Sequence, residues 1–260
     1  MDCLRIGTRG SALALRQARW VKEQLERRHS GLRCELVAIT TTGDRLQHLA
    51  LGEMEGRGVF VKEIERALLE GRVDLAVHSL KDLPVELPEG LVLAAVPPRG
   101  DPLDALVSRD GAPLEGLPPG ARVGTSSARR RLQLLLARPD LEVVSLRGNL
   151  DTRLRKLEAG QVEAIVVAAV GLQRLGLERR PAHRLSPEVM LPSPGQGALA
   201  VESRADDHRA RALAAALEDR ASRQEVTAER AFLRRLGGGC RVPIAALGRV
   251  RDGVLWLWAG

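Results

Sequence analysis

The 260-residue sequence contains no tyrosine, two phenylalanines and three tryptophans. Proteins that bind single-stranded nucleic acid stack bases on aromatic side chains, so this chain is poorly equipped for that function. The sequence also lacks long hydrophobic runs. Its longest, residues 164–172, is far shorter than the about 20 apolar residues that span a bilayer. The N-terminus has no apolar run of the kind found in signal peptides.

Cysteine and lysine are scarce too. Cys3, Cys34 and Cys240 are odd in number and widely separated, which favours a reducing cytoplasm over a disulfide framework. Their spacing does not match that of zinc ligands, so we predict no metal. Only four lysines occur, and arginine supplies the rest of the 40 cations behind the net charge of +7. Arginine binds carboxylates in a bidentate manner, so one interpretation is an anionic ligand. The other is ordinary solvated helix faces.

Strand-like and helical segments alternate along the chain. Short apolar runs such as residues 34–39 and 73–79 predict strands, and the amphipathic segment 12–28 predicts a helix. This alternation is typical of α/β proteins with largely parallel sheets.

Two pairs of segments resemble each other within the chain. Residues 6–17 and 123–133 both pass from a strand through Gly-Thr and a serine into a helix, and residues 68–82 resemble 157–171. The similarity predicts two related α/β lobes, with a ligand in the cleft between them.

The second pair differs in its last residues. One copy ends in apolar residues, whereas the other has His78, Ser79, Lys81 and Asp82 at the carboxyl end of its strand. Ligands bind at that end of strands in open α/β sheets. Asp82 is the candidate acid–base or cation-stabilising group, because a carboxylate beside Lys81 stays ionised. A plain surface turn ending at Pro84 is the alternative.

Several strand-to-helix turns carry hydroxyl groups and arginines. In residues 124–131, GTSSARRR, the start of a helix offers backbone N–H groups and hydroxyls that favour an anion. Simple serine capping with solvated arginines is the alternative. The recurrence of this arrangement predicts a ligand with several negative groups. The residues concerned are Arg9, Ser11, Thr125, Ser126, Ser127, Arg129, Arg130, Arg147 and Arg153.

Three glycines, Gly237 to Gly239, directly precede Cys240. They contribute no side chains to a core but allow a tight bend that leaves the thiol accessible. Cations near a thiol lower its pKa and make it a better nucleophile, and Arg234, Arg235 and Arg241 are candidates. A buried structural thiol is the alternative.

Five of these motifs follow one another in the order and spacing of the porphobilinogen deaminase (hydroxymethylbilane synthase) family. The resemblance extends over nearly the whole chain, from residue 5 to residue 248. The motifs are HSLKDLP, GTSSARRR, SLRGNLDTRL, LPSPGQGA and GGGCRVPI.

The resemblance implies an enzyme that joins four porphobilinogens head to tail with loss of ammonia. It implies a dipyrromethane cofactor attached to Cys240 by a thioether, and hydrolytic release of a linear tetrapyrrole. Asp82 matches the catalytic aspartate. The implied cofactor-binding residues besides Cys240 are Lys81, Ser11, Thr125, Ser127, Arg129, Arg130 and Arg147, and the implied substrate-binding residues are Arg9, Arg153, Arg174, Gln196, Arg57 and Phe60.

The resemblance also implies the fold: two lobes like those of periplasmic binding proteins, with mixed, largely parallel sheets, and a small C-terminal α+β domain. The first lobe takes residues 1–98 and 197–216, the second 99–196, and the C-terminal domain 217–260, which is shorter than usual in the family. We expect a monomer with the small molecule porphobilinogen as its partner, not nucleic acid or a membrane. The main alternative is a non-catalytic bilobal protein that binds a small polyanion, which needs neither Asp82 nor Cys240.

Overall fold

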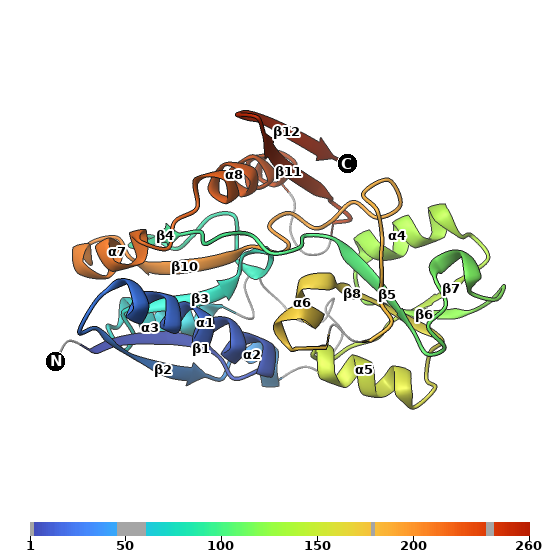
Figure 1. Ribbon diagram of the computed structural model, residues 1–260, viewed down its shortest axis with the longest axis horizontal. Helices are drawn as coiled ribbons and strands as arrows, with labels where there is room; N and C mark the ends of the chain where they lie inside the picture. The colour runs from blue at the N-terminus through green and yellow to red at the C-terminus, as the bar shows by residue number, and fades with distance from the viewer. Residues whose placement is uncertain (1–2, 46–60, 178–179, 238–241) are drawn as a thin grey trace.

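The computed structural model describes residues 3–45, 61–177, 180–237 and 242–260. Two five-stranded sheets with flanking helices lie next to each other, and a long helix with a two-stranded hairpin lies above them (Figure 1). Two proline-containing segments, residues 96–103 and 185–198, connect the two sheets, and residues 216–219 lead to the long helix.

The first sheet has the strand order β2-β1-β3-β10-β4. Strand β1 runs parallel to β2 and β3, whereas β10 runs antiparallel to β3 and β4. The strands and helices of this part are β1 (Cys3–Arg9), α1 (Ala12–Arg28), β2 (Arg33–Ile39), α2 (Thr42–Arg45), α3 (Lys62–Leu69), β3 (Leu75–Ser79), the 3₁₀ turn Leu80–Asp82, β4 (Leu91–Ala95), β10 (Leu199–Arg204) and α7 (His208–Ala215).

The second sheet repeats this arrangement in the order β7-β6-β8-β5-β9, with β6 parallel to its neighbours and β5 antiparallel to β8 and β9. The predicted mixed α/β fold of two similar halves is therefore confirmed. Its elements are β5 (Asp104–Ser108), the 3₁₀ turn Leu114–Gly116, β6 (Arg122–Gly124), α4 (Ala128–Ala137), β7 (Glu142–Val144), α5 (Leu150–Glu158), β8 (Ala164–Ala168), α6 (Ala169–Arg174) and β9 (His183–Arg184).

Helix α1 shows how the sequence pattern produces the packing. Its buried positions recur every three to four residues and so form one apolar face, which packs on the strands of the first sheet. Ser11 caps the helix by accepting a hydrogen bond from the Ala14 N–H. The core that results contains Leu4, Ile6, Ala18, Val21, Leu25, Leu75 and Val77.

The chain crosses between the sheets twice, after β4 and again before β10. The two crossover segments contact each other, because the Gly100 N–H donates to the Gly197 carbonyl at 3.2 Å. Gly197 has a φ of +90°, and a Cβ there would lie 2.5 Å from the Gly100 oxygen. Only glycine fits this close approach. The exact domain boundaries given above stay a prediction.

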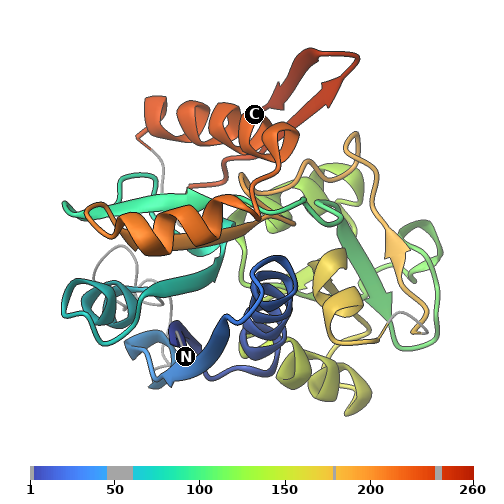
Figure 2. The same ribbon diagram turned by 60° about the vertical axis from the view of Figure 1, so that its left-hand side comes forward.

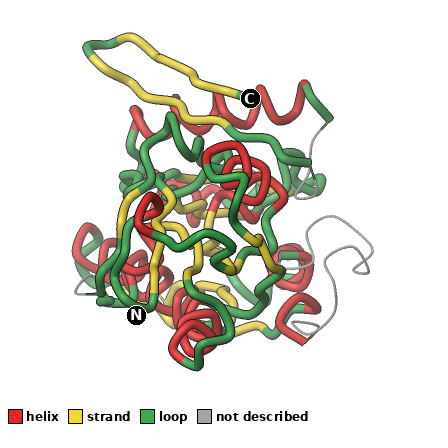
Figure 3. The backbone as a smooth tube through the Cα atoms, turned by 90° about the vertical axis from the view of Figure 1, so that its right-hand side faces the viewer, coloured by secondary structure: helices red, strands yellow, loops and turns green. Residues whose placement is uncertain are grey.

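Helix α8 (Arg220–Arg235) packs against the hairpin of β11 (Ala246–Arg251) and β12 (Val254–Ala259). The hairpin projects from the molecule (Figures 2 and 3). Every residue of β12 is exposed, including Trp256 and Trp258.

One buried guanidinium connects this part to the crossovers. The Arg99 side chain, 2% exposed, donates to Glu229 at 2.7 Å and 3.2 Å and to the Gln196 carbonyl at 2.9 Å. Glu229 is fully buried and also accepts the N–H groups of Gly195 and Gly248, at 2.6 Å and 2.7 Å. Burial raises the pKa of Glu229 more than these partners lower it, so this carboxylate needs all of them to stay ionised.

We predict that Glu229→Gln lowers the free energy of unfolding by about 3 kcal/mol, because it removes the closer of the two carboxylates that pair with the buried Arg99 and leaves only Glu225, at 3.3 Å. Denaturant unfolding at neutral pH measures this. The control is Glu218→Gln, which loses a partly exposed pair with Arg223 and should cost at most about 1 kcal/mol. Equal losses in both variants contradict the role assigned to the buried pair.

Candidate functional site

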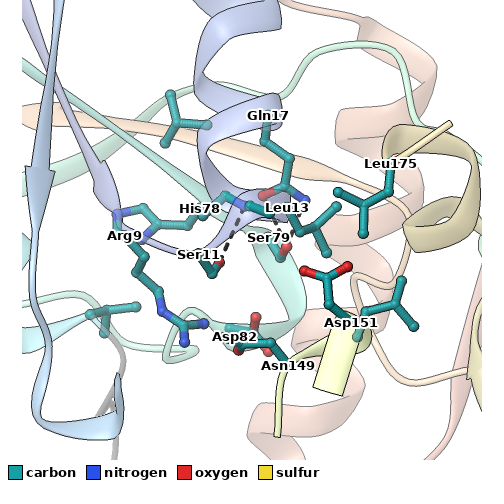
Figure 4. Close-up of a pocket in the computed structure, with 15 residues that line it drawn as sticks. Arg9, Ser11, Leu13, Gln17, His78, Ser79, Asp82, Asn149, Asp151 and Leu175 are labelled. Carbon is teal, nitrogen blue, oxygen red and sulfur yellow. Dashed lines mark hydrogen bonds between the residues drawn. The ribbon is translucent and has the colours of Figure 1, made fainter. Parts of the chain in front are cut away.

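A pocket lies between the two sheets and takes residues from both sides (Figure 4). The side of the first sheet contributes polar groups from β1, α1 and the end of β3. The side of the second sheet contributes the start of α5 and the end of α6. The main lining residues are Arg9, Ser11, Gln17, His78, Ser79, Asp82, Asn149, Leu150, Asp151 and Leu175.

Asp82 enters this pocket from the 3₁₀ turn that follows β3. The start of the turn is fixed by two hydrogen bonds. The Leu80 N–H donates to the Ala198 carbonyl at 3.0 Å, and Gln17 Nε2 donates to Ser79 Oγ at 2.9 Å. The turn that carries Asp82 is therefore held by α1 and by the second crossover.

Lys81 points to the crossover side of the same turn. Its Nζ donates to Gln196 Oε1 at 3.2 Å, and the fully buried Gln196 donates in turn to Asp104 at 3.0 Å. Burial, with a smaller contribution from Arg130, lowers the pKa of Lys81 to about 8, although Asp82 and Asp104 oppose the shift. Lys81 is thus connected to the second sheet through Gln196.

Arg129 and Arg130 lie buried against Asp104. Each places a guanidinium nitrogen 2.7 Å from an Asp104 oxygen. Arg129 also donates to the Leu191 carbonyl and Arg130 to the Val166 carbonyl. Sequence reasoning missed Asp104, although an aspartate at the start of the apolar segment DALV was a signal for a buried charge pair.

The predicted hydroxyl groups lie at the starts of helices. Ser11 and Ser127 cap α1 and α4, and Thr125 Oγ1 accepts a hydrogen bond from the Ser127 N–H at 3.2 Å. These contacts are the capping arrangement weighed above. Their part in binding an anion stays a prediction.

Arg9 forms an ion pair with Asp44. Asp44, like Asp104, was not identified from the sequence. Burial alone would raise the pKa of Asp44, but hydrogen bonds from Arg9 and Thr41 lower it below its usual value. Arg9 therefore lines the pocket in a fixed orientation.

Arg153 and Arg174 differ from these paired arginines. Arg153 donates to the Gly148 carbonyl at 2.9 Å, and Arg174 donates to the Gly197 carbonyl at 2.7 Å. Burial lowers the pKa of each to about 10, with Arg130 and Arg147 adding to the shift of Arg153. Within the described ranges neither has a carboxylate at ion-pair distance. The cleft thus holds buried positive charge that an anionic ligand can balance.

Three predicted residues, Cys240, Arg57 and Phe60, lie outside the described residues. In the part of the chain that the structure describes, no group of His, Cys, Asp and Glu side chains is arranged to hold a metal ion. No helix there has the length and apolar character needed to cross a membrane.

Comparison with solved structures supports the fold. The methionine binding protein MetQ aligns over 96% of this chain and 99% of its own, with a TM-score of 0.52 and 15% identity. At this identity the likeness extends to the bilobal architecture and no further.

Comparison with protein families is more specific. Residues 4–212 match the model of the porphobilinogen deaminase dipyrromethane cofactor binding domain, and residues 223–260 match the porphobilinogen deaminase C-terminal domain. A protein from Syntrophotalea carbinolica named porphobilinogen deaminase is 56% identical over 98% of this chain and 81% of its own length. One of the same name from Syntrophus aciditrophicus is 52% identical over 97% and 82%. The chain therefore belongs to the porphobilinogen deaminase family.

Proposed function

We propose that this chain condenses porphobilinogen units in the cleft between its two large sheets, with Asp82 as the catalytic carboxylate and Cys240 as the attachment point of dipyrromethane. The family match makes the chain a tetrapyrrole-forming transferase and sets aside the non-catalytic alternative. The observation that carries the residue assignment is the position of Asp82, on a braced turn facing a cleft rich in buried cations.

The charges of the cleft suit a dipyrromethane with acidic side chains. Burial disfavours the charged forms of three cations in the cleft, Lys81, Arg153 and Arg174. In the described parts of the chain no carboxylate lies at ion-pair distance from them. Carboxylates of a bound ligand can supply the missing partners through charge-assisted hydrogen bonds. Dipyrromethane, when bound, supplies the terminal pyrrole carbon on which chain growth begins.

Asp82 acts by electrostatics and hydrogen bonding. Its carboxylate accepts a pyrrole N–H of the substrate and stabilises the positive charge that develops as ammonia leaves. A carboxylate held in place before the reaction stabilises such charge better than water, which must reorient. Gln17 and Ala198 fix the turn that carries it, so the side chain loses little conformational entropy when it takes its working position.

We further propose that the enzyme acts as a cytoplasmic monomer on a small-molecule substrate, without nucleic acid or membrane partners. The scattered cysteines and the lack of aromatic stacking residues support this.

We predict that Asp82→Asn lowers kcat by at least about 10²-fold, because the neutral amide no longer stabilises developing positive charge. Steady-state kinetics with porphobilinogen measures this, and circular dichroism checks that the fold is kept. Asp110→Asn, at an exposed site far from the pocket lining, is the matched control and should behave as the wild type. Near-normal turnover of Asp82→Asn contradicts the assignment.

We predict that Cys240→Ser removes the covalent cofactor. Intact mass spectrometry of the wild type should show an adduct of two porphobilinogens less their ammonia, and peptide mapping should place it on the peptide with Cys240. Cys3→Ser and Cys34→Ser, which change an exposed and a buried thiol, should keep the adduct. An adduct that survives in Cys240→Ser refutes the attachment site.

A further inference from the structure

Three ionisable side chains lie together behind the turn that carries Asp82. His78 is on β3, Glu202 on the neighbouring strand β10, and Glu65 on α3, which packs against both strands. Because Ala200 pairs with His78 and Glu202 pairs with Ala76, the two side chains point to the same face of the sheet. We call His78, Glu202 and Glu65 the buried triad.

All three members of the buried triad are shielded from water. His78 and Glu65 are each 5% exposed and Glu202 is fully buried. His78 Nε2 lies 3.2 Å from Glu202 Oε2, within ion-pair distance. Even so, His78 Nε2, Glu65 Oε1 and both oxygens of Glu202 have no hydrogen-bond partner among the described residues. Two ionised carboxylates in such surroundings raise the free energy of the folded state, and a proton on one of them lowers it again.

The charged groups around the buried triad do not compensate for a second ionised carboxylate. Lys62, also on α3, lowers the pKa of Glu65 only as the smallest contribution. On β1 the charge of Arg9 is paired with Asp44. On α8 Arg230, which interacts with Glu202, donates its hydrogen bonds to the carbonyls of residues 83–85.

Burial, reinforced by the charge of Glu202 and opposed by His78, raises the pKa of Glu65 from its ordinary value of 4.5 to about 7. Glu65 therefore holds its proton below neutral pH and gives it up to solvent above. The ionised Glu65 on α3 then faces Glu202 on β10.

The buried triad is directly connected to the catalytic turn. His78 is followed by Ser79, whose hydroxyl bonds Gln17, and by Leu80, whose N–H bonds Ala198. Glu202 follows the same crossover residues along β10. Repulsion between Glu65 and Glu202 acts between α3 and β10, and β10 directly follows Ala198, whose carbonyl accepts the Leu80 N–H of the turn.

We propose that one proton buried in the triad, held on Glu65 beside Glu202, keeps the turn carrying Asp82 in its working position, so that losing this proton lowers turnover. In this scheme His78 is a positioning residue. The proposal rests on the catalytic role of Asp82 given above.

The first test follows stability against pH in the full-length protein. Since the folded state holds the Glu65 proton more tightly than the unfolded state, stability falls as pH rises from about 4.5 to above 7. Glu65→Gln, which stays neutral, should equal the wild type at pH 4.5 and exceed its melting temperature at pH 8 by at least about 3 °C. Glu23→Gln, at an exposed position of α1, should follow the wild type at both values.

The second test follows turnover. For each protein the ratio of kcat at pH 8 to kcat at pH 6 is measured with saturating porphobilinogen. Glu65→Gln should raise this ratio at least about fivefold over the wild type, and Glu23→Gln should leave it unchanged. Glu202→Gln, which removes the opposing charge instead, should raise the kcat ratio as well. This variant replaces Glu65→Gln in the test if Glu65→Gln does not fold. Neither Glu65→Gln nor Glu202→Gln, whose side chains do not line the pocket, should change KM comparably.

The outcomes separate the two proposals. Identical melting profiles of Glu65→Gln and wild type show that the buried triad stores no proton and overturn the inference. A melting difference with an unchanged kcat ratio makes the buried triad purely structural and overturns the positioning role. Full activity of Asp82→Asn overturns the catalytic assignment, while the melting difference stands independently of it.

Discussion

Arg99 reaches from the first crossover into an interior where its charge has almost no contact with water. A guanidinium in that position must be surrounded by acceptors, because its desolvation is otherwise uncompensated. Its partners come from α8 and from the second crossover, and Glu229 adds backbone groups of Gly195 and Gly248. One ion pair therefore fixes the C-terminal helix and hairpin to both connections between the large sheets. The turn with Asp82 is hydrogen-bonded to the second of these connections, from the Leu80 N–H to the Ala198 carbonyl.

The cleft depends on an unequal distribution of charge. Asp104 pairs with both Arg129 and Arg130 in the interior of the second lobe and balances one of their two charges, and Asp44 orients Arg9. Lys81, Arg153 and Arg174 keep mainly neutral oxygen partners. Paired arginines thus build the walls of the site, while the remaining cations are the groups that we propose bind an acidic ligand.

Sequence patterns predicted the architecture well because they report local preferences. Apolar positions at a helical spacing in α1, strand–helix alternation and the repeated Gly-Thr turn gave two similar mixed sheets. The carboxyl end of β3 was predicted to be functional because polar residues there replace the apolar residues of the second copy. The partners of these groups were not predicted, since Asp44, Asp104 and Glu229 approach the arginines only after distant segments pack together.

The sequence by itself determined the family and the order of strands and helices, and it supplied the candidate site residues. Only the tertiary structure decided which arginines are already neutralised, which hydroxyls cap helices, and that His78, Glu202 and Glu65 meet behind Asp82. The physical reason is that spacing along a chain specifies the faces of helices and strands. Desolvation and charge pairing depend instead on atoms brought within a few ångströms by folding.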